Sequence, residues 1–378
     1  MNAPTEQQQF DILIIGAGLA GSCLAHSLST SKISCCVIDT KAEYPENFRA
    51  DKLEHNQIAA LRELQLDQFV LPKSAPIGVI QSYEDGSVKN IDTIDQYGFA
   101  YTQTVNNLRS SLPTNAPLVI GKIVSCETSK TQQSVTLKDG RIFTGRLIVL
   151  ATGGAGKNLL KTLGLKRKTQ SELSSLNFGF DVCTTDGSSF NFNGFNYHAE
   201  NQSEGANYVT LFPIGNTMKV NIFTQWSANE KKAKAMKADP LTQMPLYFSN
   251  LYSYTGTLKL ASNVQVFPTS YYRVQKPAKA GLVVIADEYQ SVSPATGKGL
   301  DKLTTDVALL SKEYIPNWIS GSEICANSIS AFYNNPIKVS ADLKAYEEWH
   351  YYRNLTRGQS FGFLEKCTFK FNSLLNRF

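Results

Sequence analysis

The residues best suited to chemistry in this sequence are three closely spaced glycines near the N-terminus and an acid that follows them. The apolar run Ile12-Leu13-Ile14-Ile15 leads into Gly16-Ala17-Gly18-Leu19-Ala20-Gly21, and a second apolar run, residues 35–38, ends at Asp39. A strand, a glycine turn, a helix and a second strand in this order are typical of a βαβ unit that binds the pyrophosphate of a dinucleotide. The helix expected over residues 20–28 would direct its N-terminal N–H groups, including those of Leu19 and Ala20, at the phosphates.

Each position of this motif has its own expected role. Gly16 allows the tight turn, Gly18 lets the backbone approach a pyrophosphate, and Gly21 lets the helix pack closely on the strand. Asp39 can accept hydrogen bonds from the 2′- and 3′-hydroxyls of a ribose. A free 2′-hydroxyl favours FAD or NAD over NADP, and the motif alone does not choose between FAD and NAD.

Composition excludes several classes of protein. The chain has 378 residues, of which 42% are hydrophobic and 18% charged, and its length suits about two domains. The formal charge of +5 is dispersed, so we expect no nucleic acid partner. We expect no transmembrane segment, because no apolar stretch approaches the roughly twenty residues that a bilayer requires. Seven cysteines without a CxxC and four scattered histidines indicate reduced thiols and no metal site, and we therefore expect a cytoplasmic protein.

The apolar patterns along the chain predict an α/β fold made of separated pieces. Helical spacing predicts helices over residues 56–64 and 103–112, and buried strands are expected at 147–150 and 282–285. From about residue 176 to 266 aromatic and polar residues alternate, as in antiparallel strands. We therefore expect a Rossmann-like, discontinuous FAD-binding domain, an inserted antiparallel β-sheet domain for substrate, and a C-terminal helical segment. The boundaries expected are 10–75, 100–170 and 270–340 for the first, 76–99 and 171–269 for the second, and 341–378 for the third.

Further motifs give the sequence a family resemblance. They are Arg49-Ala50-Asp51-Lys52-Leu53-Glu54, a helix start at Gln103-Thr104, and Asp287 followed by Pro294 and Gly297-Lys298-Gly299-Leu300. In this order, over nearly all of residues 10–310, the chain resembles the single-component FAD-dependent aromatic hydroxylases of the para-hydroxybenzoate hydroxylase type. The resemblance implies that FAD is the cofactor and that Asp39 holds the adenosine ribose.

The resemblance also implies roles along the rest of the cofactor. Arg49 and Gln103 would lie along its pyrophosphate and ribityl region, and Asp287 would bond to the ribityl chain. The loop with Pro294, Gly297 and Gly299 would pass the isoalloxazine ring, where the N–H groups of Leu300 and Asp301 would stabilise the anionic reduced flavin.

The sequence departs from the family pattern where the reductant is handled. An Asp-Gly pair usual in the family is replaced by Ala151-Thr152-Gly153-Gly154, and Asp301 stands where the family commonly has Asn. Direct use of NADH or NADPH is therefore open, and a separate flavin reductase is an alternative partner. If the Asp301 side chain turned inward, it would bring a negative charge near the flavin.

The activity implied by the resemblance is monooxygenation through a flavin C4a-hydroperoxide, with O₂ and an aromatic or polyketide-like small molecule as substrates. No catalytic side chain stands out. Three alternatives remain: a flavin-dependent reductase or dehydrogenase, a halogenase-like enzyme (although no WxWxIP sequence is present), and a non-catalytic flavin- or ligand-binding protein. We expect the substrate wall on the aromatic-rich sheet, with five candidates: Phe178, Phe180, Tyr208, Phe212 and Phe223.

Overall fold

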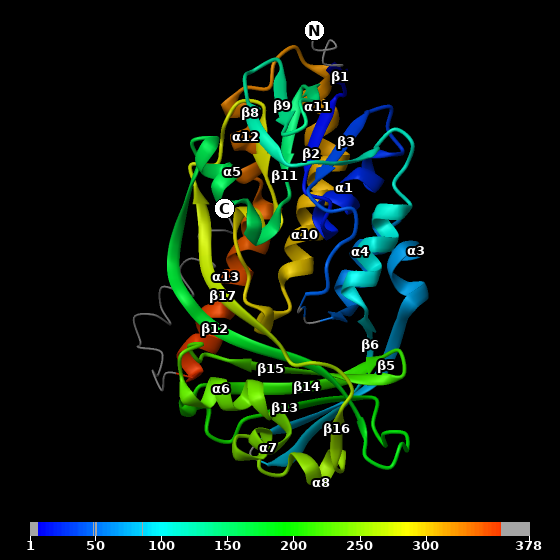
Figure 1. Cartoon of the computed structure of the whole chain (residues 1–378), viewed down its shortest axis with the longest axis vertical. Coiled ribbons are helices and arrows are strands. Elements are labelled where there is room, and N and C mark those ends of the chain that lie inside the picture. The colour runs from blue at the N-terminus through cyan, green and yellow to red at the C-terminus, as the bar shows by residue number, and fades with distance from the viewer. Residues whose placement is uncertain (1–6, 48, 50, 85, 357–378) are drawn as a thin grey trace.

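The computed structural model describes residues 7–47, 49, 51–84 and 86–356. The molecule is elongated, with a parallel sheet and most of the helices at one end and a broad mixed sheet at the other (Figure 1). The predicted α/β fold is therefore confirmed. The last part of the expected C-terminal segment, residues 357–378, lies outside the described residues.

A five-stranded parallel sheet forms the centre of the first end. Its strands occur in the order β18-β11-β2-β3-β7. The first four of them are almost wholly buried, which explains why they read as continuous apolar runs rather than as alternating ones. Because all five run in the same direction, their carboxyl ends open at one edge of the sheet. Their bounds are β2 Ile12–Ile15, β3 Cys35–Asp39, β7 Leu118–Ile120, β11 Leu147–Leu150 and β18 Leu282–Val284.

Helices cover this sheet and extend it towards the other end. α1 (Leu19–Leu28) contacts both α4 (Tyr101–Ser110) and α10 (Gly299–Leu309), and α10 contacts α2 (His55–Glu63) and the long C-terminal α13 (Pro336–Thr356). The predicted helices are thus present, with ends shifted by one or two residues. The remaining α-helices here are α3 Asp67–Val70, α5 Lys157–Thr162, α9 Ala286–Tyr289, α11 Ile315–Ser320 and α12 Ala326–Tyr333.

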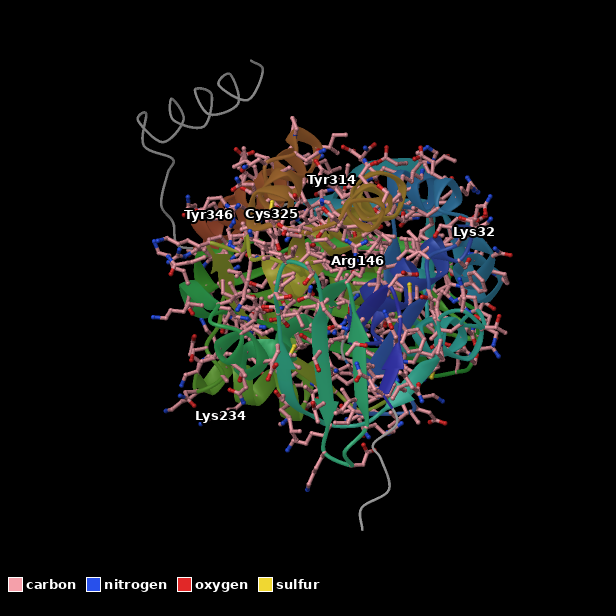
Figure 2. All side chains as sticks on the ribbon, turned by 90° about the horizontal axis from the view of Figure 1, so that it is seen from above. Lys32, Arg146, Lys234, Tyr314, Cys325 and Tyr346 are labelled. Atoms are coloured by element: carbon pink, nitrogen blue, oxygen red, sulfur yellow. The ribbon has the colours of Figure 1, made fainter. Side chains whose placement is uncertain are left out.

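A small four-stranded sheet lies against this end of the molecule. It consists of β1 (Gln7–Gln9), β10 (Ile142–Gly145), β9 (Gln133–Leu137) and β8 (Ile123–Glu127), in that order. Arg146, labelled in Figure 2, follows β10. Its two terminal nitrogens donate to the carbonyls of Ile319 and Gly321, both at 2.6 Å, which ties this sheet to the end of α11.

The large mixed sheet has a buried layer of its own. One face of its strands packs under α6 (Lys231–Ala238), α7 (Pro240–Gln243) and α8 (Leu251–Thr255), with Trp226, Met236 and Phe248 in a second hydrophobic core. The strand order is β16-β12-β15-β14-β13-β5-β6-β4, with β17 paired to β12. The strands are β4 Lys52–Leu53, β5 Ser74–Glu84, β6 Ser87–Phe99, β12 Lys166–Thr184, β13 Gly194–His198, β14 Ala206–Ile214, β15 Thr217–Thr224, β16 Leu258–Leu260 and β17 Gln265–Gln275.

Two long strands connect the two ends. β12 and β17 pair from Lys166 with Gln275 to Gly179 with Gln265 and run along one side of the molecule into the large sheet (Figure 1). The expected boundaries at residues 170 and 269 fall within these strands, and the division into domains stays a prediction. In the part of the chain described, no helix is both long and apolar enough to cross a membrane.

Candidate functional site

The glycine turn between β2 and α1 has the conformation that its sequence predicts. Gly16 has a φ of +104°, and a Cβ there would lie 2.6 Å from the carbonyl oxygen of Ala151. A Cβ on Gly21 would lie 1.9 Å from the carbonyl oxygen of Gly16, which explains the close packing of helix on turn. Gly18 is the N-cap of α1, and no side chain caps that N-terminus. The first backbone N–H groups of α1 are therefore available to a ligand.

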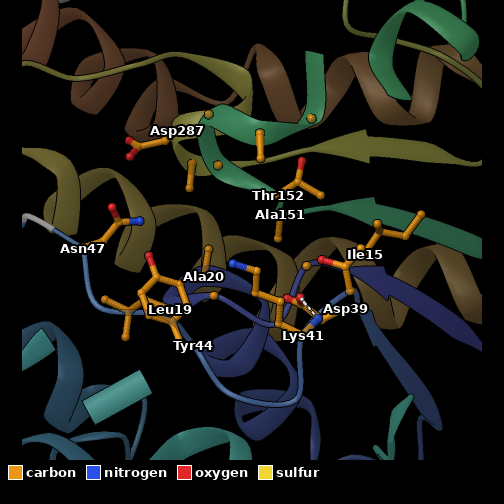
Figure 3. Close-up of a pocket in the computed structure, with 18 of the residues that line it drawn as sticks. Ile15, Leu19, Ala20, Asp39, Lys41, Tyr44, Asn47, Ala151, Thr152 and Asp287 are labelled. Carbon is orange, nitrogen blue, oxygen red and sulfur yellow. Dashed lines mark hydrogen bonds between the residues drawn. The ribbon is translucent and has the colours of Figure 1, made fainter. Parts of the chain in front are cut away.

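Asp39 ends β3 beside this turn and is held by an arginine that the sequence analysis did not single out. Its Oδ2 accepts from the Ala17 N–H at 2.8 Å and from Arg109 Nη2 at 2.7 Å. Arg109, on α4, is buried and also donates to the carbonyls of Ala17, Lys41 and Ala42. It thus fixes the acid and the loop after β3 together, while Asp39 still lines a cavity (Figure 3).

This cavity has a volume of about 850 Å³, which lies in the range of small-molecule and cofactor sites. It begins at Gly16, Gly18 and Asp39, and it passes Asp287 and the Pro294–Leu300 region. Asp39 and Asp287 lie on opposite sides of it, with the Ala151–Thr152 turn between the two (Figure 3). Residues from all the predicted cofactor motifs therefore line this one cavity, except Gln103.

The far part of the cavity contains Arg49 and Asp287. The Arg49 guanidinium lies 5.2 Å from the ring centre of Tyr101 and 5.4 Å from that of Phe267, and it donates to the Tyr44 hydroxyl at 3.0 Å. Burial raises the pKa of Asp287, although Lys302 and Arg49 act in the opposite direction. Arg49 is thus part of the cavity wall.

A strained residue sets the direction of Asp287. Ala286 has a φ of +52°, a conformation costly for any residue with a Cβ. Its N–H donates to Asp306 Oδ2 at 2.8 Å, and Asp306 Oδ1 is bound in turn by Lys338 Nζ at 2.6 Å. Lys338 comes from α13, so the C-terminal helix supports the start of α9, which carries Asp287 beside the cavity.

The loop before α10 presents backbone to the cavity. Gly297 has a φ of +67°, and α10 begins at Gly299 without a side-chain cap. Gly299 and Leu300 line the cavity, whereas the Asp301 carboxylate is bound by Asn56 and by Gln57 Nε2 from α2. The inward negative charge considered for Asp301 is therefore not found, because α2 supplies two amide donors on the outer side of the loop.

A buried glutamate binds the turn at Thr152–Gly156, where the sequence departs from the family pattern. Glu288 is fully buried, and its Oε2 accepts from the Thr152 hydroxyl and, at 3.1 Å, from the Gly156 N–H. Its Oε1 accepts from Arg167 Nη2 at 2.6 Å, and Arg167 also bonds to the carbonyls of Gly153 and Gly154. The turn has no acid in its own sequence, and the carboxylate that binds it belongs to Glu288, the residue after Asp287.

A comparison with known proteins decides the family of this site. The model of a family described as "FAD binding domain" matches residues 9–314. The chain belongs to this FAD binding domain family. FAD is accordingly its cofactor, and the cavity suits it: a glycine cradle that a Cβ would fill, an acid at the end of β3 and two uncapped helix N-termini.

This FAD binding domain protein is similar to several known proteins and solved structures. It is 28% identical over 160 residues to the FAD-dependent monooxygenase penM of Penicillium crustosum, a match that covers 39% of this chain and only 34% of that protein. PqsL of Pseudomonas aeruginosa, titled a probable FAD-dependent monooxygenase, has a TM-score of 0.73 at 16% identity and covers 93% of this chain and 98% of its own. The p-nitrophenol 4-monooxygenase PnpA of Pseudomonas putida has a TM-score of 0.70 at 11% identity, covering 98% and 94%. At these identities, the two structures show a shared fold.

Two groups of predicted residues of this FAD binding domain protein lie away from the cavity. Gln103 is exposed on α4, and Tyr101 lines the cavity in its place. Phe178 and Phe180 are fully buried in the second core, Phe178 with its ring centre 6.0 Å from that of Trp226. This corrects the expectation that they form the substrate wall, because alternate residues of β12 face opposite sides of the sheet.

The other three aromatic candidates face the opposite side of the large sheet. Tyr208, Phe212 and Phe223 come from β14 and β15, and the Tyr208 hydroxyl donates to the Ala295 carbonyl in the loop before α10 at 2.6 Å. They are not among the residues that line the cavity. Asp51, Phe99 and Phe267, in or next to strands of the large sheet, do line it, and the sequence analysis did not name them as substrate residues.

Proposed function

We propose that this protein is an FAD-dependent monooxygenase that hydroxylates an aromatic or polyketide-like small molecule with O₂. The observation that carries the proposal is the continuity of one cavity from Asp39 to the loop before α10, where it ends against Asp51, Phe99 and Phe267 of the large sheet. A flavin enzyme needs its ring and its substrate in one enclosed space, from which water is excluded. The aromatic side chains of Phe99 and Phe267, with Asp51 beside them, suit an aromatic substrate.

In this proposal, the chain's own residues bind and orient the cofactor. Gly16, Gly18 and the first N–H groups of α1 hold the pyrophosphate, and Asp39 holds the ribose. Asp287 bonds to the ribityl chain, with Arg49 beside it. When bound, FAD supplies the activation of O₂ and the transfer of one oxygen atom. The backbone N–H groups at Leu300 and Asp301, with the positive end of α10, stabilise negative charge on the reduced ring.

The source of electrons is the finer part of the proposal. We propose NADH or NADPH as direct reductant, with a separate flavin reductase as the alternative. The Glu288 carboxylate supports a stable turn at Thr152 to Gly156, since it bonds to both ends of that turn. It is fully buried, so it supports the geometry of the turn and does not reach a second nucleotide.

Two measurements on the FAD-loaded protein test the proposal. Under anaerobic conditions, NADH or NADPH with a panel of phenols should bleach the flavin absorbance. Under ¹⁸O₂, mass spectrometry should then find one labelled oxygen atom in the product.

Each alternative has its own outcome. Bleaching without label indicates a reductase or dehydrogenase, and a halogenated product in the presence of halide indicates a halogenase. Bleaching only after a flavin reductase is added indicates a two-component system. FAD binding without reduction by any of these donors contradicts the enzyme proposal and leaves a binding protein.

A further inference from the structure

The end of the cavity is closed by an acidic residue in an unusual conformation. Asp51 has a φ of +54°, and its carbonyl accepts from the Phe99 N–H at 2.9 Å, which fixes the backbone at the junction of β4 and β6. A left-handed aspartate costs conformational energy, so the surrounding contacts must hold it there. The result is a carboxylate in the cavity wall on the side of the large sheet.

Asp51 belongs to a cluster of three charged groups, of which Asp51 and Lys219 are buried and Asp181 is partly exposed. Its Oδ2 lies 3.4 Å from Lys219 Nζ, and Lys219 Nζ lies 3.8 Å from Asp181 Oδ1. Asp51 and Lys219 have side chains that are each 10% exposed. Lys219 of β15 and Asp181 of β12 are directly paired in the sheet, so both project from the same face. Two carboxylates share one ammonium group.

One oxygen of this cluster has no partner. Asp51 Oδ1 is buried and accepts no hydrogen bond from any of the described residues. Two further buried oxygens without partners, Asn177 Oδ1 and Thr210 Oγ1, come from the same face of the sheet. A buried carboxylate oxygen without a donor is costly, and a ligand that donates a hydrogen bond would remove that cost.

We infer that Asp51 anchors the substrate through Oδ1, and that it selects uncharged aromatic ligands with an O–H or N–H donor against aromatic carboxylates. The inference rests on the proposed function, since it concerns the substrate of that same cavity. The charges support it. A ligand carboxylate would place its negative charge beside those of Asp51 and Asp181 and would leave Oδ1 without a donor.

The surroundings also make the anchor dependent on pH. Burial raises the pKa of Asp51 to about 7, with Lys219 and Arg49 lowering it and Asp181 raising it. Only the ionised carboxylate is a full acceptor, so affinity for a neutral donor ligand should increase as the pH rises through about 7. Removal of Lys219 should move this midpoint upwards, and removal of the Asp181 charge should move it downwards.

Calorimetric titration of the oxidised, FAD-loaded protein tests this without turnover. The probes are 2-naphthol, 2-methoxynaphthalene and 2-naphthoate, which differ only in the donor or charge. At a pH near 8, we expect 2-naphthol to bind at least about tenfold more tightly than the other two. Asp51→Asn keeps a neutral amide oxygen, which is a weaker acceptor, so it should lose part of that factor for 2-naphthol and bind 2-naphthoate better than the wild type does.

Control measurements separate this role from a structural one. FAD content and melting temperature identify a variant that fails to fold. The opposite pH shifts of Lys219→Met and Asp181→Asn keep the inference testable if Asp51→Asn fails. Equal binding of 2-naphthol and its methyl ether, tighter binding of 2-naphthoate, or a pH midpoint unmoved in both variants would overturn it. Because no oxygen transfer is needed, a negative ¹⁸O₂ result leaves this test intact.

Discussion

Replacing Lys338 by methionine should lower the stability of the protein, because Lys338 is part of the buried charged cluster that holds the start of α9 and Asp287. Lys338 is 1% exposed, with its Nζ 2.6 Å from Asp306 Oδ1 and 3.4 Å from Asp342 Oδ2. Lys302, also 1% exposed, lies 3.4 Å from Asp342 Oδ1, so two lysines and two aspartates balance in the interior. Loss of one lysine leaves a buried negative charge without a partner. Breaking such a pair costs about 3–5 kcal/mol of unfolding free energy.

Urea denaturation followed by circular dichroism measures this cost. Lys344→Met is a matched control, because Lys344 lies on the same helix and is exposed; it should change stability by less than about 0.5 kcal/mol. In the double variant Lys338→Met with Asp306→Asn, charge balance returns and the amide oxygen can still accept from Ala286. It should regain at least about 1 kcal/mol relative to the single variant. A loss below about 1 kcal/mol in the single variant would refute the reasoning.

Three further predictions concern the cofactor turn, the ribityl acid and a buried histidine. Gly16→Val should abolish FAD loading, because its Cβ would clash with the Ala151 carbonyl, whereas Gly140→Val, with nothing within 4 Å of its Cβ, should keep the flavin spectrum. Asp287→Ala should lower the flavin content after gel filtration. Burial lowers the pKa of His26 below 6.5, so the native state holds it neutral; the stability that it contributes is present above about 6.5 and is lost as the pH falls further. The unfolding free energy should therefore fall less steeply towards pH ~5 in His26→Gln than in the wild type.

Each of these has a clear contrary result. A yellow Gly16→Val protein would mean that the turn does not cradle the cofactor, and normal flavin content in Asp287→Ala would remove that residue from the site. Equal slopes for His26→Gln and the wild type would contradict the assigned burial.

Local signals in the sequence were sufficient for the cofactor half of the fold. The turn at Gly16 and the acid at Asp39 each depend on a few neighbouring residues, so spacing alone predicted them. The loop that contains Gly297 was predicted from the family resemblance, and its left-handed glycine was not foreseen. Arg109 could not be found in this way, because its partners at residues 17, 39, 41 and 42 approach it only in the folded chain.

The sequence analysis did not predict correctly which side of a helix or strand certain side chains occupy. Gln103 and Tyr101 are two helical positions, or about 200°, apart, so an error of two residues exchanges an exposed side chain for one in the cavity. Both faces of β12 are buried, so apolar alternation did not reveal which face Phe178 and Phe180 occupy. The contact of Glu288 with the turn at Thr152 could not be predicted, because the two residues are 136 positions apart and meet only in the folded chain.

Titration of the cofactor-free protein with FAD tests the central claim most directly. The account predicts saturable binding of one FAD per chain in the wild type, and loss of that binding in Gly16→Val but not in Gly140→Val. Absence of saturable binding in the wild type, or equal binding by both glycine variants, would contradict it.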